Sequence, residues 1–453
     1  MNQRIVIVGA GITGLAAGHE AQRHGHEVVV LDRAERAGGK IATETVEGTH
    51  LPFPVDLAAD GFLARRPEVV GLVEELGLAG ELVAPRTSRA FLWVDGQLRA
   101  IPSPSVLGVP LEPDAVAGSG LVSEAGVAEL RAGLTRDAAP LLGDASVGEV
   151  LRPRLGDEVF ERLVDPLLGG INAGNADQLS IVAGAPQLAA AAATGGRFDE
   201  ALRRQATEAQ AAAAGPVFNG IRGGNGRLIE ALAATLGPNL RLGHEVTGLQ
   251  RSAEGWTVAT ARGPFTADRV VLATPAPVTA RLIEPYCPTA AHMLTELGYG
   301  DAVLVTFVVE REGITHDLDG SGFLVPRDQG LLMTACSWTS SKWEHYDDGV
   351  HAVLRVSAGR TDDQRWLTLA PDELVAALTE ELRVTVGLTG QPITRVSPWR
   401  QSLPQYRPGH FERCDAIDAE LAERAPGITA SGAQMRGLGL PACVGQGRSA
   451  ISG

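Results

Sequence analysis

Six residues near the start of the chain have the types and spacing of a phosphate-binding turn. The apolar run Arg4–Val8 is followed by the pattern GxGxxG, which comprises Gly9, Ala10, Gly11, Ile12, Thr13 and Gly14. In such a pattern the first glycine permits a tight turn, the second lets the backbone approach a pyrophosphate, and the third lets a helix pack closely on a strand. The start of that helix then faces the negative charge of the phosphates.

An acidic residue stands where a ribose would bind. Asp32 follows the second apolar run, Glu27–Leu31, and its carboxylate can accept hydrogen bonds from ribose hydroxyls. A glycine pair comes shortly afterwards, in a segment that contains Arg33, Gly38, Gly39 and Lys40. This extension is typical of FAD enzymes, because it lets the backbone follow the flavin side of the pyrophosphate. The sequence therefore predicts FAD as the cofactor.

The elements that must position these residues form a βαβ unit. Residues 4–8 are nearly all β-branched, as in a buried parallel strand, and residues 12–24 follow as a helix. Strand patterns return in the middle of the chain and predict a small sheet that feeds back into this first part, at residues 240–242, 246–250, 255–261 and 270–273. Later apolar runs predict a second sheet, at residues 302–309, 331–336 and 352–356.

The remaining segments predict helices and one hairpin. Residues 111–215 have no strand signal and are rich in alanine and leucine, so we expect a helical insertion, with plain helix over Leu188–Gly215. Asp95-Gly96 between two apolar runs is a two-residue hairpin signal. Near the end, a strand at 428–431 precedes a glycine-rich turn, and a last helix is predicted to begin near Gly445 and to be cut short.

Composition limits the class of protein. A chain of 453 residues exceeds the roughly 250–300 residues of a single core, so at least two lobes are expected. The net charge of −15 argues against a nucleic-acid partner, and an anionic ligand would need local arginines. Only two lysines are present, Lys40 and Lys342. The four cysteines have no zinc spacing, so no metal is expected.

The fold class that these patterns predict is α/β (α+β overall). We expect a discontinuous Rossmann-like FAD-binding domain (1–85, 216–285 and 390–453), a substrate-binding domain on a second sheet (86–110 and 286–389) and a helical lobe (111–215). No apolar stretch reaches the roughly 18–20 residues of a membrane span. The cysteine usage favours a reduced, intracellular protein. The predicted helical lobe has no basic amphipathic face with aromatic anchors, so we expect a cytoplasmic protein with at most peripheral membrane contact.

Several segments carry a resemblance to a known family. The opening resembles the amine-oxidase-like flavoproteins. Narrower matches resemble the FAD-dependent porphyrinogen oxidases of bacterial, Gram-positive type, and these are Leu163–Gly174, Gly223–Leu228, Ser337–Trp343, Trp399–His410 and Arg436–Val444. Ala58 and Gly61 depart from the glycine and serine that are more frequent in the family, and Ala442 replaces a frequent aspartate.

The resemblance implies roles for individual residues. Further contacts with FAD would come from Ala58, Ala59, Asp60, Gly61, Val246, Trp399, Gly439, Leu440 and Pro441. Contacts with the substrate would come from Arg89, through a propionate, and from Gly170 and Leu324, which would pack on the tetrapyrrole. Simpler interpretations stay open: a solvated hairpin arginine, a turn glycine, a core leucine and, for Trp399, a buried aromatic.

The resemblance also implies an activity. Aromatising a porphyrinogen removes six electrons, which FAD takes two at a time, with molecular oxygen as the final acceptor. Coproporphyrinogen III is the favoured substrate, with protoporphyrinogen IX as the alternative and possible handover of the product to a ferrochelatase. No catalytic base is identified. An amine oxidase, which would have to use Lys342, and a flavin-free binding protein are the rivals, and the intact fingerprint with Asp32 argues against the second.

Overall fold

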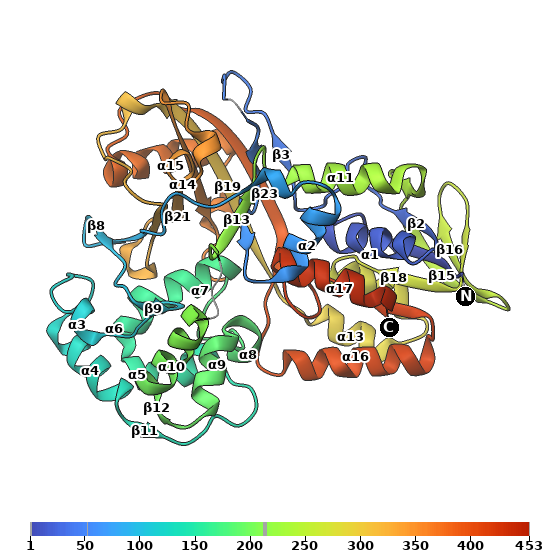
Figure 1. Cartoon of the computed structure of the whole chain (residues 1–453), viewed down its shortest axis with the longest axis horizontal. Coiled ribbons are helices and arrows are strands. Elements are labelled where there is room, and N and C mark those ends of the chain that lie inside the picture. Colours follow the sequence, from blue (N-terminus) through green and yellow to red (C-terminus); the bar gives the residue numbers. More distant parts are fainter. Residues whose placement is uncertain (1, 52, 212–214, 453) are drawn as a thin grey trace.

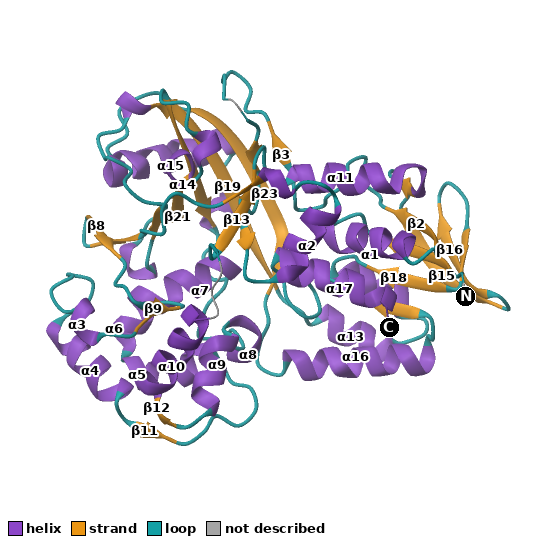
Figure 2. Cartoon of the chain, viewed as in Figure 1, coloured by secondary structure: helices purple, strands orange, loops and turns teal. Residues whose placement is uncertain are grey.

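The molecule has two halves. The structure, a computed structural model, describes residues 2–51, 53–211 and 215–452. In Figure 1, one half is built on a parallel sheet with helices on both faces, and the other combines a large sheet with a helical lobe beneath it. Figure 2 shows the strands of these two sheets and a lobe that is almost entirely helical. Among the described residues, no helix is long and apolar enough to cross a bilayer.

The parallel sheet draws its strands from three distant parts of the chain. Its order is β14-β2-β1-β18-β24, and every neighbouring pair is parallel. The strands are β1 (Arg4–Val8), β2 (Glu27–Leu31), β14 (Leu240–Arg241), β18 (Arg269–Leu272) and β24 (Ile428–Ala430). The prediction of a discontinuous Rossmann-like fold is therefore confirmed.

Helices cover both faces of the parallel sheet, as the alternation of its side chains requires. Ile5 and Ile7 share a core with α1 (Ile12–Arg23), α11 (Gly226–Leu236) and α17 (Leu440–Ser452). Side chains of the opposite parity, including Val6 and Val8, share a second core with α12, α13 and α16. The bounds of the other helices in this half are α2 (Pro67–Glu75), α12 (Ala276–Ile283), α13 (Pro288–Thr295) and α16 (His410–Arg424).

Two sequence predictions in this half are wrong. The mid-chain strands do not form one small sheet: β14 and β18 join the parallel sheet, while β15 (Val246–Ser252), β16 (Gly255–Thr260) and β17 (Phe265–Ala267) form a separate antiparallel sheet. The last helix, α17, begins at Leu440 rather than near Gly445 and extends to Ser452. Its second residue is Pro441, which suits the first turn of a helix and was misread as part of a turn.

The second half is built on a seven-stranded sheet of order β23-β19-β22-β21-β20-β7-β8. One face packs against α15 (Pro371–Val386), which provides most of the helical cover of that core. The prediction placed β23 with the FAD-binding part, whereas this strand lies at the edge of the seven-stranded sheet. The strands are β7 (Phe91–Val94), β8 (Gln97–Ala100), β19 (Tyr299–Glu310), β20 (Gly322–Leu324), β21 (Met333–Trp338), β22 (His351–Ala358) and β23 (Ile393–Pro404).

The helical lobe follows the hairpin β7–β8, whose turn residues Asp95 and Gly96 both have positive φ. Leu188–Gly215 is not one helix: α9 and α10 are separated at Gly195-Gly196, where both residues have positive φ, and residues 212–214 lie outside the described chain. The helices of the lobe are α3 (Pro113–Val116), α4 (Glu124–Leu134), α5 (Val147–Leu155), α6 (Asp157–Val159), α7 (Asp165–Asn172), α8 (Ile181–Gly184), α9 (Pro186–Ala193) and α10 (Phe198–Ala211).

Candidate active site

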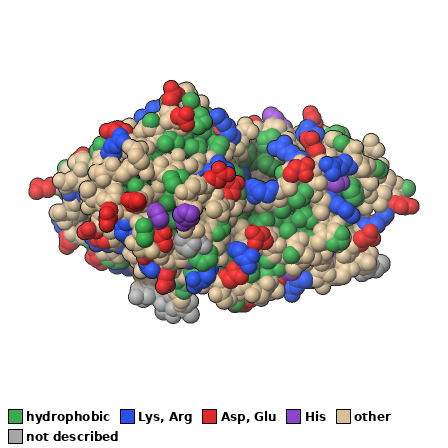
Figure 3. Space-filling view, turned by 90° about the horizontal axis from the view of Figure 1, so that it is seen from above, with side chains coloured by type: hydrophobic (Ala, Val, Ile, Leu, Met, Phe, Trp, Pro, Cys, Tyr) green, Lys and Arg blue, Asp and Glu red, His purple; other side chains and the backbone are tan. Residues whose placement is uncertain are grey.

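A cavity of about 490 Å³ opens at the carboxyl ends of the parallel strands β1 and β2. In folds of this kind, this edge of the sheet is where ligands bind. The cavity brings together ten of the residues that the sequence predicts for FAD: Gly9, Gly11, Ile12, Thr13, Asp32, Arg33, Gly39, Lys40, Val246 and Leu440. Figure 3 shows hydrophobic side chains gathered in a hollow between the two halves, with charged side chains around it.

The three glycines of the fingerprint have different surroundings. Gly9 has a φ of +107°, and a Cβ atom there would lie 2.5 Å from the carbonyl oxygen of Ala273. A Cβ at Gly14 would lie 1.9 Å from the carbonyl oxygen of Gly9, so strand and helix touch at this point. A Cβ at Gly11 would meet nothing within 4 Å. The space beside Gly11 is therefore open, as a backbone that receives a pyrophosphate requires.

The backbone around the fingerprint orients Asp32. Its two carboxylate oxygens accept hydrogen bonds from the amides of Ala10 (2.6 Å) and Ala34 (2.8 Å). The carboxylate is thereby held at the end of β2, on the wall of the cavity. This arrangement suits a group that accepts hydrogen bonds from ribose hydroxyls.

The larger sheet also contributes to the cavity, which the sequence did not reveal. Tyr299, at the start of β19, accepts a hydrogen bond from the amide of Ala276 (2.9 Å), and Ser402, near the end of β23, receives one from the ammonium of Lys40. These contacts join residues that are far apart in the sequence. No local pattern marks such positions, because they depend on how the two sheets pack.

Asp60 lies at the centre of a buried charge cluster. Its carboxylate accepts from Lys342 (3.1 Å), from Arg355 (3.0 Å) and from the indole nitrogen of Trp343 (3.1 Å). Burial opposes ionisation of Asp60, but the two cations outweigh burial and hold its pKa well below the ordinary value. The guanidinium of Arg355, whose side chain is 5% exposed, also donates to the carbonyl of Ala58. Asp60 is therefore a buried anion between two cations.

The cluster fixes residues 58–61, the segment for which the resemblance implies contacts with FAD. The carbonyl of Ala59 accepts from the side-chain amide of Asn225 (2.7 Å), and Gly61 packs against the ring of Trp343. The indole nitrogen of Trp399 donates to the carbonyl of Leu57 (2.7 Å), which places this predicted residue beside the same segment. Arg355 is not among the residues predicted from the sequence, although an arginine in the middle of an apolar strand is a visible signal.

Asp56 lies four residues before Asp60, and its pKa is shifted in the opposite direction. Burial raises its pKa to about 6, although Arg355 and the hydroxyl of Thr43 oppose that change. The folded protein then holds a proton that the unfolded chain has released, so this group lowers stability as the pH rises from about 4 to 6 and has a constant effect above that window.

We expect Asp56→Asn to abolish this pH-dependent loss of stability. The side-chain carbonyl of the new asparagine can still accept hydrogen bonds from the hydroxyl of Thr43 and the backbone amide of Asn225, and it does not titrate. Urea unfolding at pH 4 and pH 7 should show that the wild type loses about 1–3 kcal/mol more than the variant between the two values. Equal pH dependence in both proteins would contradict the assignment.

Two of the three predicted substrate residues lie on elements that are in contact. Gly170 is on α7 and Leu324 is on β20, and these two elements are in contact. A Cβ at Gly170 would meet nothing within 4 Å, so this side of α7 is open. Leu324 points away from the α15 core, since its neighbour Phe323 belongs to that core. Leu324 packs against the core of the helical lobe, to which α7 also contributes.

The structure does not bring Arg89 to that place. Its guanidinium lies 4.8 Å from the ring centre of Phe91, which belongs to the core shared with α15, and it forms an ion pair with Asp319. Its side chain is 54% exposed. The other predicted residues take different places: Ala10 and Gly14 pack behind the cavity, and Gly439 and Pro441 stand at the start of α17.

Cys443 lines the cavity near the start of α17 and is a candidate for covalent attachment of a flavin. Burial raises the pKa of its thiol, and the sulfur lies against the carbonyls of Gly437 and Leu438. Because the thiolate is the reactive form, we expect no thioether link. Acid precipitation of the purified protein should release all of the flavin into the supernatant, and a yellow pellet would contradict this expectation.

These features define a flavin-dependent oxidoreductase: a dinucleotide cavity with an open glycine turn, an oriented ribose-binding carboxylate and a second sheet that closes the site. The sequence profile of flavin containing amine oxidoreductases matches residues 12–450, and the chain belongs to this family. It is an enzyme that uses FAD.

Within the family, the chain is similar along nearly its whole length to proteins named coproporphyrinogen III oxidase. The coproporphyrinogen III oxidase of Mycobacterium leprae is 34% identical over 98% of this chain and 96% of its own. That of Bacillus subtilis is 28% identical over 99% and 97%. A crystal structure from Exiguobacterium sp. 255-15, provisionally named protoporphyrinogen oxidase, has a TM-score of 0.88 and 32% identity over 100% of this chain and 98% of its own.

Proposed function

We propose that this enzyme oxidises coproporphyrinogen III to coproporphyrin III, with molecular oxygen as the final electron acceptor. The observation that carries the proposal is the likeness to two coproporphyrinogen III oxidases over nearly the full length of both chains. The fold and the FAD cavity extend over the same residues, so the similarity includes the parts that would perform the reaction.

When bound, FAD supplies the redox chemistry, because it accepts two electrons at a time. The residues of the chain position the reactants. The fingerprint and Asp32 would hold the dinucleotide, the segment Ala58–Gly61 would line the flavin, and Gly170 and Leu324 would hold the macrocycle between the lobe and the sheet. Arg355 and Lys342 keep Asp60 ionised within this segment.

The remaining assignments belong to the same proposal. We infer three parts with the boundaries given above, except that β23 packs in the second sheet. A cytoplasmic location is consistent with four buried, unbridged cysteines. The product would pass to the step that inserts iron. Lys342 is engaged by Asp60, which makes it a poor candidate for the lysine that an amine oxidase would need.

A fluorescence assay tests the substrate, because porphyrinogens are dark and porphyrins fluoresce. FAD-loaded protein under air should convert coproporphyrinogen III faster than protoporphyrinogen IX, and should not oxidise primary amines. The second candidate, protoporphyrinogen IX, is favoured by the name of the Exiguobacterium structure. Faster turnover of protoporphyrinogen IX would establish that alternative, and formation of peroxide from amines alone would exclude both porphyrinogens.

A further inference from the structure

A second cavity, of about 510 Å³, lies where two loops of the seven-stranded sheet meet. One loop joins β20 to β21, and the other follows β22. The cavity is bordered by three arginines, Arg327, Arg360 and Arg365, and by two acids, Asp362 and Asp363. Such a concentration of arginine is notable in a chain with a net charge of −15, which repels anions unless cations gather locally.

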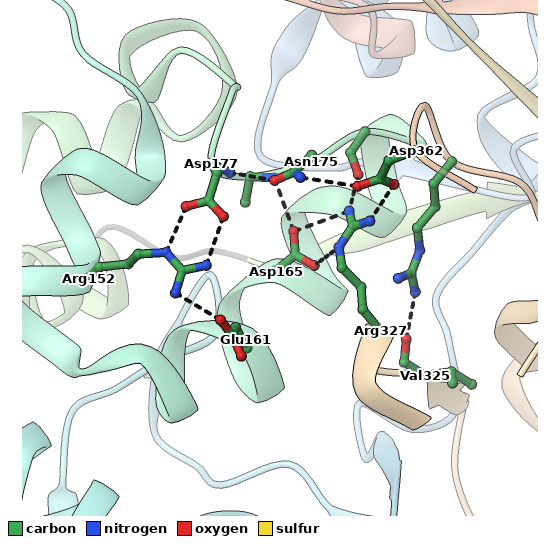
Figure 4. Close-up of polar contacts among 11 residues, drawn as sticks. Arg152, Glu161, Asp165, Asn175, Asp177, Val325, Arg327 and Asp362 are labelled. Atoms are coloured by element: carbon green, nitrogen blue, oxygen red, sulfur yellow. Dashed lines mark hydrogen bonds and ion pairs between the residues drawn. The ribbon is translucent and has the colours of Figure 1, made fainter. Parts of the chain in front are cut away.

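Two of these arginines are already paired. Arg327 forms ion pairs with Asp165 (2.6 Å) and with Asp362, which Figure 4 shows as a network that joins the loop to α7. Arg365 forms an ion pair with Asp363 (2.6 Å) and donates to the carbonyl of Leu331 (2.7 Å). The acids that border the cavity are thus engaged by arginines other than Arg360.

Arg360 differs from both. Its side chain is buried, and its Nη2 donates to the carbonyl of Val325 (2.6 Å). Within the described chain, no carboxylate lies within ion-pair distance of it, and its Nε has no hydrogen-bond partner. Burial lowers its pKa and Arg327 adds to this effect, whereas the more distant carboxylates of Asp165, Asp362 and Asp363 oppose it. A buried guanidinium that no carboxylate contacts directly can still pair with an anionic ligand.

The position of Arg360 connects it with the predicted substrate space. Val325, its hydrogen-bond acceptor, directly follows Leu324. The amide of Thr361, its neighbour, donates to the carbonyl of Ala173 (2.9 Å) at the end of α7. Arg327 donates to the carbonyl of Gly174 (2.5 Å) and lies beside Gly169, next to Gly170. The cavity therefore adjoins α7 and β20, the elements that carry Gly170 and Leu324, whereas Arg89 is paired with Asp319.

We propose that Arg360 binds a peripheral carboxylate of the macrocyclic substrate, and that its cavity is a propionate subsite. This inference rests on the proposed function and assigns to Arg360 the role that the sequence analysis gave to Arg89. A guanidinium matches a carboxylate in two parallel hydrogen bonds, and a substrate with four propionates offers such groups around its whole edge.

Binding of the product tests the subsite without turnover. The probes are coproporphyrin III and its tetramethyl ester, which has the same ring but no free carboxylate, titrated into FAD-loaded protein by fluorescence. We expect the wild type to prefer the free acid. Arg360→Met should weaken binding of the acid about tenfold or more and leave the ester unchanged, since a charge-assisted hydrogen bond contributes about 1.5–3 kcal/mol. Arg360→Lys should restore part of the loss.

Two further variants make the result specific. Arg383→Met, on the exposed face of α15, controls for overall charge, and Arg89→Met tests the rival arginine. Thermal unfolding and FAD content identify a variant that is merely misfolded, in which case Arg360→Lys decides. Unchanged affinity in folded Arg360 variants, or loss of the acid preference in Arg89→Met instead, would overturn the subsite. Absence of porphyrinogen oxidation by the wild type would instead overturn the proposed function.

Discussion

Replacement of Gly14 by alanine is expected to abolish FAD binding and to destabilise the protein. The added methyl group would lie 1.9 Å from the carbonyl oxygen of Gly9, and this neighbour is backbone rather than a flexible side chain. To relieve the contact, α1 must move away from β1 or the turn must open, and both changes disturb the cavity. Overpacking of this kind costs about 1–3 kcal/mol or more. Flavin content after gel filtration and thermal unfolding measure the two effects.

Gly11→Ala is the matched control for this prediction. The same methyl group meets nothing within 4 Å, and the φ of Gly11 is −71°, which any residue adopts. The stability of the flavin-free protein should therefore stay within about 0.5 kcal/mol of the wild type. The affinity for FAD should nevertheless fall about tenfold or more, because the methyl group occupies space that the pyrophosphate requires. Wild-type FAD affinity in Gly11→Ala would contradict the placement of the cofactor.

Asp60→Asn should have the second largest effect. The substitution keeps the shape of the side chain but removes the anion that two cations share. Arg355, 5% exposed, would then lose its counter-charge, and removing one partner of a buried pair costs about 3–5 kcal/mol. The segment expected to line the flavin would lose its anchor, so FAD affinity should fall as well. Urea unfolding of the flavin-free protein measures the stability term separately.

The same substitution at an exposed ion pair calibrates this result. Asp319 pairs with Arg89, and the two side chains are 46% and 54% exposed, so Asp319→Asn should cost less than about 1 kcal/mol. Similar destabilisation by Asp60→Asn and Asp319→Asn would mean that the buried cluster contributes no more than a surface pair.

The features that could be predicted from the sequence are those that a short local pattern encodes. GxGxxG, the acid at the end of the second strand and the following glycine pair are short-range features, and the structure gathers most of them around one cavity. Strand positions in the second sheet were also found from apolar runs. The pairing of β14 and β18 with the parallel sheet could not be read from such runs, because pairing depends on partners far along the chain.

Contacts between residues that are distant in the sequence could not be predicted, because no local pattern encodes them. Asp60, Lys342 and Arg355 form one cluster although nearly three hundred residues separate them, and only the folded chain reveals the contact. The role that the resemblance implies for Arg89 stays a prediction, and the structure pairs its guanidinium with Asp319 and places it over the ring of Phe91. Pro441 belongs to a segment predicted as a turn, whereas it lies in the first turn of α17, because proline suits both a turn and the start of a helix.

An anaerobic titration tests the central claim most directly. FAD-loaded protein is mixed with coproporphyrinogen III in the absence of oxygen, and flavin absorbance and porphyrin fluorescence are followed together. The account predicts that the yellow flavin absorbance bleaches on addition of the substrate, and that admitting air restores it while coproporphyrin III fluorescence rises. Flavin that stays oxidised in the presence of excess coproporphyrinogen III would contradict the claim that this FAD enzyme acts on that substrate.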